Sequence, residues 1–487
     1  MTATAPGVTY GLMQTSFSLA QLADPHMRES EKILRSCVHC GFCTATCPTY
    51  LLLGDELDSP RGRIYLIKDM LENGKPATQE IVKHIDRCLS CLSCMTTCPS
   101  GVHYMHLVDH ARTYIEKTYV RDLRDRFVRA LLAYVLPYRG RFRLALAGAS
   151  IVQRLLSFHA ATHKLLRLPA PRDPHTPPRE MTRTGLLRRV GAMIALAPQR
   201  LPSGAKDANP PLVSTGSGRK RVALLTGCAQ AVLAPSINEA TIRLLARHNV
   251  DVVLPQGEGC CGALVHHMGR DDEALGFARR NIDVWTREID NGGLDAILIT
   301  ASGCGTTIKD YGFMLRDDPA YAERAARVSA IAKDITEYLD ALDLAKPARP
   351  SRLTVAYHSA CSMQHGQRIA DVPKRLLRSA GFKVKDIPEG HICCGSAGTY
   401  NILQPGLAMA LRDRKLANIA KTRPDVIATG NIGCITQLAS GTTVPIVHTI
   451  ELLDWATGGP KPTILREVAG DLLAADKSAP QTELAAR

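Results

Sequence analysis

From residue 220 onward, short apolar runs alternate with segments whose apolar residues recur at the spacing of an amphipathic helix. Segments 238–247 and 272–287 have this helical spacing. The apolar runs are short enough to be buried strands: 222–225, 252–254 and 296–299, then 353–356, 382–387 and 426–428. Strands that alternate with helices form a parallel sheet with covered faces. The pattern predicts a duplicated α/β domain.

The N-terminal part of the chain has a different pattern. Between residues 106 and 135, apolar residues recur at helical spacing among charged ones, which predicts amphipathic helices at the end of a small helical domain.

Downstream, segment 169–211 contains nine prolines. Proline lacks the backbone donor and fixes φ, so it opposes long helices and central strands. We expect the main linker in this segment.

All sixteen cysteines belong to two internal repeats. The first repeat is a C-x2-C-x2-C-x3-C-P run that returns after 51 positions: Cys37, Cys40, Cys43 and Cys47, then Cys88, Cys91, Cys94 and Cys98. The second is a cysteine, a Cys-Cys-Gly and a further cysteine, at offsets of 133 and 130: Cys228, Cys260, Cys261 and Cys304, then Cys361, Cys393, Cys394 and Cys434. A reducing cytosol argues against eight disulfides, so these cysteines are expected to be metal ligands or redox centres.

The first cysteine pattern is typical of two 4Fe-4S clusters. Three closely spaced thiolates bind one cluster, and the fourth cysteine of the run binds the other cluster. We therefore expect one cluster on Cys37, Cys40, Cys43 and Cys98, and the other on Cys88, Cys91, Cys94 and Cys47. Tetrahedral zinc also uses C-x2-C pairs, but it has no use for a third cysteine at the same step. His39 lies inside the run and is expected to shield the sulfur.

The second pattern places each cysteine directly after a predicted strand. The carboxyl ends of parallel strands meet at one edge of a sheet, so four sulfurs are expected to converge in each repeat. Adjacent cysteines can both face one metal if Gly262 and Gly395 turn the backbone sharply. An iron-sulfur centre in at least one repeat is favoured, with zinc and reactive thiols as alternatives. Five histidines lie near these loops and none is expected to be a ligand: His266, His267, His358, His365 and His391.

Composition limits the remaining possibilities. The chain has 487 residues, 45% hydrophobic and 22% charged, as expected for about three globular domains. No run of 18 apolar residues could span a membrane, and the first 27 residues lack the basic start and apolar block of an export signal. We expect a cytoplasmic protein. The sequence has no nucleophile elbow or phosphate loop, and Gly395 to Gly398 is too weak a motif for nucleotide binding.

Positive charge is concentrated in one segment. Residues 121 to 220 contain 19 Lys and Arg but only 5 Asp and Glu, which accounts for the whole formal net charge of +14. A solvated connector is one interpretation. The alternative is docking to an acidic partner or to an anionic membrane surface, with the main contribution from Arg139, Arg141, Arg143, Arg188 and Arg189. Nucleic acid is not expected as a partner, because few aromatic residues are available to stack on bases.

The cysteine motifs and their surroundings resemble the iron-sulfur subunit of bacterial glycolate oxidase (glycolate dehydrogenase), in the wider group of ferredoxin plus cysteine-rich-domain proteins related to heterodisulfide reductase. The similar segments are SCVHCGFCTATCPTY, GDELDSPRGRIYLIK, CLSCMTTCPSGV, ASGCG, CCGSAGTY and NIGC. They cover roughly residues 31 to 120 and 220 to 455. In the related reductases the cysteine-rich repeat ends in Cys-x-x-Cys, whereas this chain has Thr307 and Gln437 at the last positions.

The resemblance implies an electron-transfer subunit. Flavin-containing partner subunits would carry FAD and oxidise glycolate to glyoxylate, and this chain would pass the electrons to a quinone or another acceptor. Peripheral binding at the inner face of the cytoplasmic membrane is a further option. An alternative is a thiol or disulfide reductase that acts at the Cys-Cys-Gly sites.

Pattern, cysteines and resemblance together divide the chain into six segments. These are an N-terminal extension (1–30), a ferredoxin-type domain with two clusters (31–120), a basic and partly proline-rich connector (121–219), cysteine-rich repeat 1 (220–345), cysteine-rich repeat 2 (346–458) and a C-terminal tail (459–487).

Overall fold

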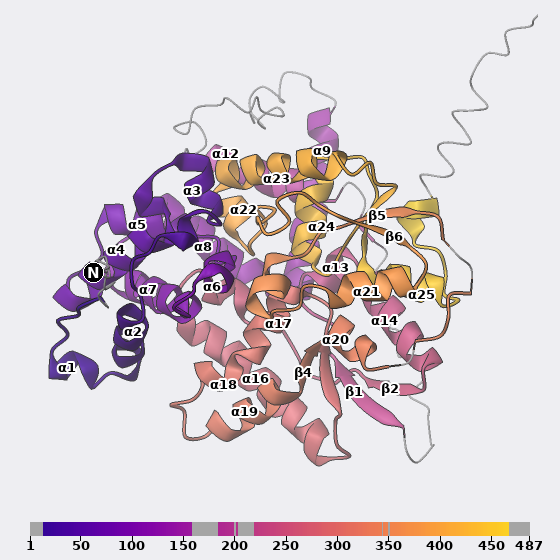
Figure 1. Cartoon of the computed structure of the whole chain (residues 1–487), viewed down its shortest axis with the longest axis horizontal. Helices are drawn as coiled ribbons and strands as arrows, with labels where there is room; N and C mark the ends of the chain where they lie inside the picture. Colours follow the sequence, from indigo (N-terminus) through magenta and orange to yellow (C-terminus); the bar gives the residue numbers. More distant parts are fainter. Residues whose placement is uncertain are drawn as a thin grey trace, which may run out of the picture.

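A computed structural model describes residues 13–157, 184–198, 201–202, 219–342, 344–348 and 351–466. A helical N-terminal domain lies at one side of the molecule, and two α/β domains make up the other (Figure 1). This arrangement confirms the predicted fold class. Segments 1–30 and 459–487, and most of the proline-rich stretch, extend beyond the described residues.

The N-terminal domain is built from short helices. They are α1 (Leu19–Leu22), α2 (Pro25–Arg35), η1 (Phe42–Thr44), α3 (Pro48–Leu53), η2 (Glu56–Asp58), α4 (Pro60–Asn73), α5 (Gln79–Asp86), α6 (Ser93–Thr97) and α7 (Tyr104–Thr118). The Ser59 side chain accepts a hydrogen bond from the backbone of Gly62, and Pro60 fits the first turn, so α4 begins there. Its buried face, with Ile67 and Leu71, packs against α5 and α7.

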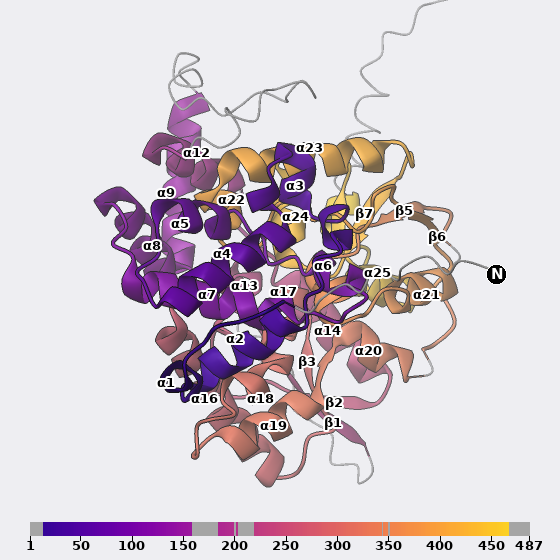
Figure 2. The same cartoon turned by 60° about the vertical axis from the view of Figure 1, so that its left-hand side comes forward.

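Three helices of the basic segment follow: α8 (Leu123–Val135), α9 (Arg139–Ser157) and α12 (Leu186–Leu196). The amphipathic helices predicted between 106 and 135 are confirmed as α7 and α8. The prediction that prolines prevent a long helix in 169–211 is wrong for α12, because no proline lies between Pro178 and Pro198. Figure 2 shows α8, α9 and α12 together beside α22 (Tyr400–Leu403) of the second repeat. Among the described residues, no helix has the length and apolar character needed to cross a membrane.

Each α/β domain contains a four-stranded parallel sheet. The first has the order β2-β1-β3-β4 and the second the order β6-β5-β7-β8. The strands are β1 (Lys220–Leu224), β2 (Val250–Val253), β3 (Ala296–Ile299) and β4 (Ala332–Asp334), then β5 (Thr354–Tyr357), β6 (Lys383–Asp386), β7 (Val426–Thr429) and β8 (Ile446–His448). The sequence pattern missed β4 and β8, which have three residues each and lie at sheet edges.

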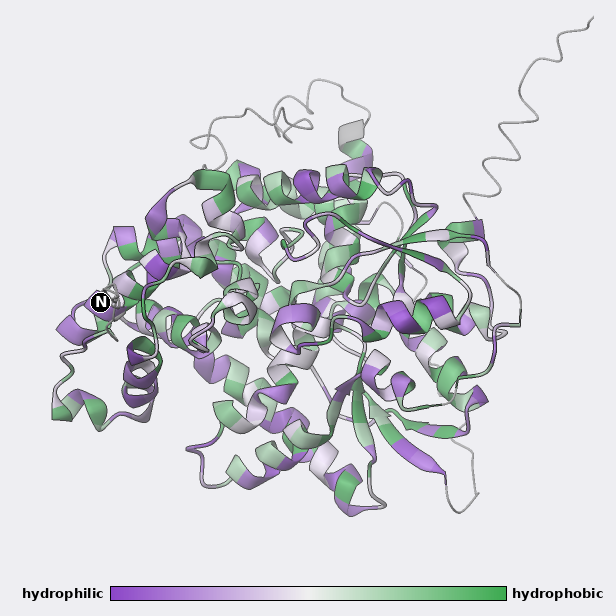
Figure 3. Cartoon of the chain, viewed as in Figure 1, coloured by the Kyte–Doolittle hydropathy of each residue, from purple (hydrophilic) through white to green (hydrophobic). Residues whose placement is uncertain are grey.

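Helices cover both faces of these sheets. In repeat 1 they are α13 (Gln230–Leu233), α14 (Ser236–Arg247), α15 (Ala263–His266), α16 (Asp271–Asp290), α17 (Ser302–Lys309), α18 (Tyr311–Met314), α19 (Ala322–Ile331) and α20 (Ile335–Asp340). In repeat 2 they are η3 (Ser362–Gly366), α21 (Val372–Ser379), α22, α23 (Pro405–Ala420), α24 (Ile432–Ala439) and α25 (Thr449–Ala456). Figure 3 shows hydrophobic residues on the central strands and mixed residues on the outer helices.

The two repeats share one hydrophobic core. Residues of both sheets, such as Val222 and Val355, belong to the same buried cluster. Helix α14 of repeat 1 packs against α25 of repeat 2, and α20 packs against α21, so the contact is reciprocal. Asp454 is 1% exposed at this contact and accepts hydrogen bonds from Arg243 at 2.8 Å and Arg247 at 2.5 Å.

We expect Asp454→Ala to lower the free energy of unfolding by about 1–3 kcal/mol, because three charge-assisted hydrogen bonds from Arg243 and Arg247 are lost while both arginines can regain water. Asp290→Ala is the matched control. Its ion pair with Arg327 joins side chains that are 55% and 51% exposed, so the cost should stay below about 1 kcal/mol. Urea unfolding of the metal-loaded protein measures both changes. Equal effects of the two variants would contradict a role of Asp454 in joining the repeats.

Candidate metal centres

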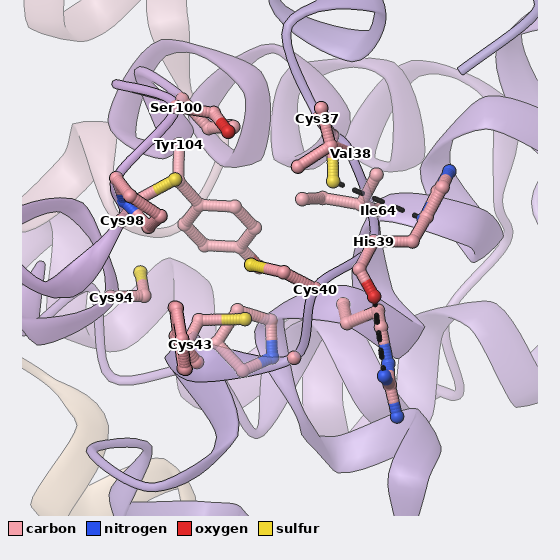
Figure 4. A pocket seen from close by; sticks show the side chains of 16 residues that line it. Cys37, Val38, His39, Cys40, Cys43, Ile64, Cys94, Cys98, Ser100 and Tyr104 are labelled. Atoms are coloured by element: carbon pink, nitrogen blue, oxygen red, sulfur yellow. Dashed lines mark hydrogen bonds between the residues drawn. The ribbon is translucent and has the colours of Figure 1, made fainter. Parts of the chain in front are cut away.

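The first set of cysteines comes from both copies of the C-x2-C-x2-C run. Cys37 follows α2, Cys43 lies in η1 and Cys98 follows α6. Together with Cys40 and Cys94 they line one small cavity, beside the ring of Tyr104 (Figure 4). Burial, together with the neighbouring thiols of Cys37, Cys47 and Cys98, raises the pKa of Cys43 to about 12. We call Cys37, Cys40, Cys43 and Cys98 ferredoxin group 1.

The second set is more deeply buried. Burial raises the pKa of Cys94 well above its usual value, and the thiols of Cys91, Cys88 and Cys47 act in the same direction. Burial also raises the pKa of Cys91, to which Cys47 and Cys88 again contribute. Cys47 thus lies with the cysteines of the second run, although it belongs to the first. We call Cys47, Cys88, Cys91 and Cys94 ferredoxin group 2.

The two cysteine runs also share their backbone conformation. His39 and Ser90 occupy the same place in the two runs and have φ values of 54° and 50°. The next such pair, Gly41 and Leu92, has φ values of 81° and 63°. A left-handed conformation is uncommon for residues other than glycine, and such residues cluster at functional sites. The loops therefore have the same tight curvature, which turns successive cysteines toward a common centre.

A buried cation borders ferredoxin group 2. Arg63 is 1% exposed, and its guanidinium donates to the Cys47 sulfur at 3.8 Å and to the His84 carbonyl at 2.8 Å. Burial alone would lower the pKa of Arg63, but the thiols of Cys88 and Cys47 and the carboxylate of Asp58 hold it above its usual value. Arg63 can offset the negative charge that thiolates bring into a buried site. The sequence analysis did not single it out, although it lies in the segment GDELDSPRGRIYLIK.

The cysteines of repeat 1 converge after three strands. The sulfurs of Cys228 and Cys260 lie 3.6 Å apart. At Cys261 the contact with Cys260 lowers the pKa, but the contact with Cys304 and burial outweigh it and raise the pKa well above its usual value. We call Cys228, Cys260, Cys261 and Cys304 the repeat 1 group.

Repeat 2 has the same chain of contacts. The sulfurs of Cys361 and Cys393 also lie 3.6 Å apart. At Cys394 the contact with Cys393 lowers the pKa. The contact with Cys434 and burial outweigh this effect, so the pKa lies well above its usual value. We call Cys361, Cys393, Cys394 and Cys434 the repeat 2 group.

Glycine makes the adjacent cysteines possible in each repeat. Gly262 and Gly395 both have a φ of +87°, as the sharp turn requires. A Cβ atom at Gly262 would lie 2.9 Å from the carbonyl oxygen of Ala274, and one at Gly395 would lie 2.2 Å from that of Ala408. Neither position has room for a side chain, so the helices α16 and α23 can pack directly against the cysteine loops.

The two repeats differ in the groups around the sulfurs. His358 is 1% exposed, neither of its ring nitrogens has a hydrogen-bond partner among the described residues, and its ring lies within 4.8 Å of the Cys394 and Cys434 sulfurs. Three positions before its first cysteine, repeat 1 has Leu225 instead. His358 is therefore placed where it could act as a ligand together with these sulfurs, which the sequence analysis did not expect. The only sequence signal is this difference between the repeats.

His266 and His365 make contacts away from the sulfurs. His266 pairs with Asp109 at 3.4 Å and with Asp271 at 3.3 Å, which joins repeat 1 to α7. His365 contacts the Thr96 hydroxyl at 2.7 Å and the His391 carbonyl at 3.1 Å. These contacts hold the domains together.

Ferredoxin group 2 and the repeat 2 group are neighbours in the interior of the protein. Cys91 of ferredoxin group 2 and Cys393 of the repeat 2 group belong to one buried cluster, against which Cys361 packs. Burial raises the pKa of Cys91, and the thiol of Cys361 is the next largest cause of this increase. Helix α17 of repeat 1 and η3 of repeat 2 are connected by a hydrogen bond of 2.7 Å between the hydroxyls of Ser302 and Ser362.

The arginines proposed as a docking face also make contacts within the protein, although Arg139 and Arg141 are exposed. Arg189 is buried and pairs with Asp125 at 2.6 Å. Arg139 donates to the Gly227 carbonyl at 2.9 Å, and Arg141 stacks on Tyr134. Arg143 donates to the Pro202 carbonyl at 3.2 Å. These side chains stabilise the packing of α8, α9 and α12, so the charge of the segment is not a measure of a free basic surface.

Comparison with known proteins extends this picture. Residues 33–102 match the model of the 4Fe-4S dicluster domain, and residues 222–309 and 355–439 both match that of the cysteine-rich domain. A crystal structure of a hypothetical protein from Helicobacter pylori has a TM-score of 0.50 with 12% sequence identity, and it covers 91% of this chain and 74% of that one. That likeness concerns the fold alone.

Two relatives cover nearly the whole chain. The glycolate oxidase iron-sulfur subunit of Escherichia coli is 41% identical over 91% of this chain and 99% of its own length. The probable glycolate oxidase iron-sulfur subunit of Bacillus subtilis is 32% identical over 88% of this chain and 96% of its own length. The chain therefore belongs to the family of glycolate oxidase iron-sulfur subunits, as the resemblance in its cysteine motifs indicates.

Proposed function

We propose that this chain is the electron-transfer subunit of a flavin-dependent glycolate oxidase and passes electrons from the 2-hydroxy acid toward a quinone. The observation that carries the proposal is the contact between ferredoxin group 2 and the repeat 2 group through Cys91, Cys361 and Cys393. This contact joins the two kinds of cysteine site into one continuous series. A series of adjacent redox sites is what a conducting subunit needs, and a purely structural metal site needs no such neighbour.

The residues fit the clusters that the family implies. All sixteen cysteines are free thiols, and fifteen of them are buried or half-buried. Ferredoxin groups 1 and 2 would each hold one 4Fe-4S cluster, and the clusters would supply one-electron transfer when bound. The chain's own residues would exclude water, fix the sulfurs through the tight loops, and compensate charge through Arg63.

Oxidation of the acid itself requires another subunit. A flavin can remove a hydride, which carries two electrons, from the carbon of the 2-hydroxy acid. The reduced flavin can then release these electrons one at a time. The Escherichia coli relative is named an iron-sulfur subunit, which fits a complex with further subunits. We place this complex in the cytoplasm, at the inner face of the membrane where quinones are available.

Thiol–disulfide exchange at the Cys-Cys-Gly sites is less well supported. The nucleophile in such exchange is a thiolate. The contact with Cys260 raises the pKa of Cys228 well above its usual value, as does burial, and Cys361 is raised by Cys393 in the same way. Protonated, buried thiols are inert, whereas a metal can displace the protons and use all four sulfurs.

The crossed ligand sets give the first test. We expect Cys40→Ser and Cys98→Ser to remove the same cluster, because both belong to ferredoxin group 1, and Cys47→Ser and Cys91→Ser to remove the other. Each variant should lose four iron atoms per chain, and its electron paramagnetic resonance spectrum should lose one of the two ferredoxin-type signals.

The pairing of variants is the internal control of this experiment. If Cys98→Ser resembles Cys91→Ser rather than Cys40→Ser, each cysteine run binds its own cluster and the crossed assignment is wrong. If a variant with one cluster still passes electrons from glycolate to a dye acceptor at the full rate, the series of sites is not the electron path.

His358 gives the second test. We propose that its imidazole is a ligand of the metal centre in repeat 2, together with thiolates of the repeat 2 group. His358→Leu reproduces the residue that repeat 1 has at the corresponding place, so the fold should tolerate it. We expect the metal of repeat 2 to be lost to a chelator at least tenfold faster, and nitrogen coupling to disappear from the resonance or X-ray absorption spectrum of that metal.

His391→Leu is the control for this substitution, since its carbonyl, and not its ring, contacts His365. Nitrogen coupling that persists in His358→Leu but vanishes in His391→Leu would assign the ligand elsewhere. Unchanged metal release in His358→Leu would show that the thiolates alone hold the metal.

A further inference from the structure

A large apolar cavity lies between the basic helices and the repeat 1 group. Its volume is about 510 Å³, within the range typical of small-molecule sites. Helices α8, α9 and α12 supply one wall, with Leu132, Phe142, Leu146 and Met193 among the lining residues. The opposite wall contains all four cysteines of the repeat 1 group. The cavity therefore brings a ligand-sized apolar space directly to a candidate redox centre.

Two polar atoms of the lining have no partner. Gln230 is 3% exposed, and its Oε1 atom has no hydrogen-bond partner among the described residues, although its amide nitrogen donates to Asn238 and Thr300. The buried Nδ1 atom of His267 also has no partner in that part of the chain. An unpaired polar group in an apolar environment costs free energy, so each is a candidate contact for a ligand. One can accept a hydrogen bond, and the other can donate one.

The cavity continues to the surface along α9. Three of its lining residues, Leu131, Ala145 and Val152, are exposed. Next to them, Leu144 is 76% exposed, Ile151 59% and Leu155 64%. Contiguous exposed apolar residues mark contact with an apolar partner. A ligand that fills the cavity can therefore leave through an apolar opening, as a ligand with a long hydrocarbon tail requires.

We propose that this cavity binds the ring of a membrane quinone, with its isoprenoid tail leaving past α9. A quinone matches the three features of the cavity. Its planar ring suits an apolar space, its carbonyl oxygen can accept from His267, and the hydroxyl of its reduced form can donate to Gln230. The position of the ring beside the repeat 1 group would make that group the last site before the acceptor. The inference rests on the proposed electron-transfer function.

The reduction balances with the reaction of the complex. Oxidation of one 2-hydroxy acid to the 2-oxo acid releases two electrons and two protons. The quinone takes up two electrons, one at a time from the cysteine-bound centres, and two protons from water, and both carbonyl groups become hydroxyls. No other oxidant or reductant is needed.

The binding test uses the full chain with its clusters, kept anaerobic, and decylubiquinone as the probe. Ala149 lines the cavity, so Ala149→Phe should fill part of it and weaken decylubiquinone binding at least tenfold. Ala195→Phe is the matched control, because Ala195 is an exposed residue of α12 outside the lining, and its binding should equal that of the unchanged chain. Iron content and resonance spectra show whether each variant is folded. A photoreactive azidoquinone should label residues of α8, α9 or α12, as read by mass spectrometry.

The outcomes separate the inference from the proposed function. Equal decylubiquinone binding by both folded variants, or labelling confined to other elements, would overturn the quinone site. Labelling that is blocked when a flavin subunit binds the chain would make this face a protein interface and would also overturn it. Reduction of a dye by glycolate through the complete unmodified complex tests electron transfer alone, so its failure would instead reject the proposed function.

Discussion

The structure depends on one constraint: cysteines that are far apart in the sequence must bring their sulfurs together while excluding water. In the α/β repeats this is achieved by the parallel sheet, because the ends of β1, β2 and β3 meet at one edge and each is followed by a cysteine loop. The tight approach of Gly262 and Gly395 to the next helices then fixes two adjacent cysteines at the same edge. In the helical domain, loops with left-handed residues have the same effect. Burial of so many thiols is stabilised by metal binding, which couples cluster assembly to folding.

Those parts of the structure that follow from periodicity could be predicted from the sequence. The central strands of both sheets are continuous apolar runs, and the cysteine spacing shows the duplication. Strands β4 and β8 could not be predicted, since three residues at a sheet edge have no period to detect. Helix α12 was missed because a count of prolines ignores their positions. Arg63 and His358 could not be recognised either, because a buried partner is defined by packing between segments that the sequence leaves unconnected.

The basic segment shows how composition can mislead. Its excess charge suggests a solvated surface, but Arg139 donates to the Gly227 carbonyl of repeat 1, and Arg189 pairs with Asp125, which joins α12 to α8. The same helices carry apolar residues on two faces. One face closes the cavity at the repeat 1 group, and the other leaves Leu144 and Leu155 in contact with solvent. The segment is thus a structural element that covers the repeat 1 group, and several of its arginines contribute to that packing.

Duplication gives both repeats the same backbone, and single substitutions then give them different surroundings. Ala274 and Ala408 face equivalent glycines, so Asn281 on α16 corresponds to Lys415 on α23. Lys415 is 1% exposed, and burial lowers its pKa against the opposing effect of the nearby Cys394 and Cys393. Repeat 2 therefore has a buried amine and an imidazole near its sulfurs, whereas repeat 1 has neutral residues at both places and faces an apolar cavity. A metal site beside a buried amine and one beside an apolar space meet different electrostatic demands, so the same fold can give its two copies different properties.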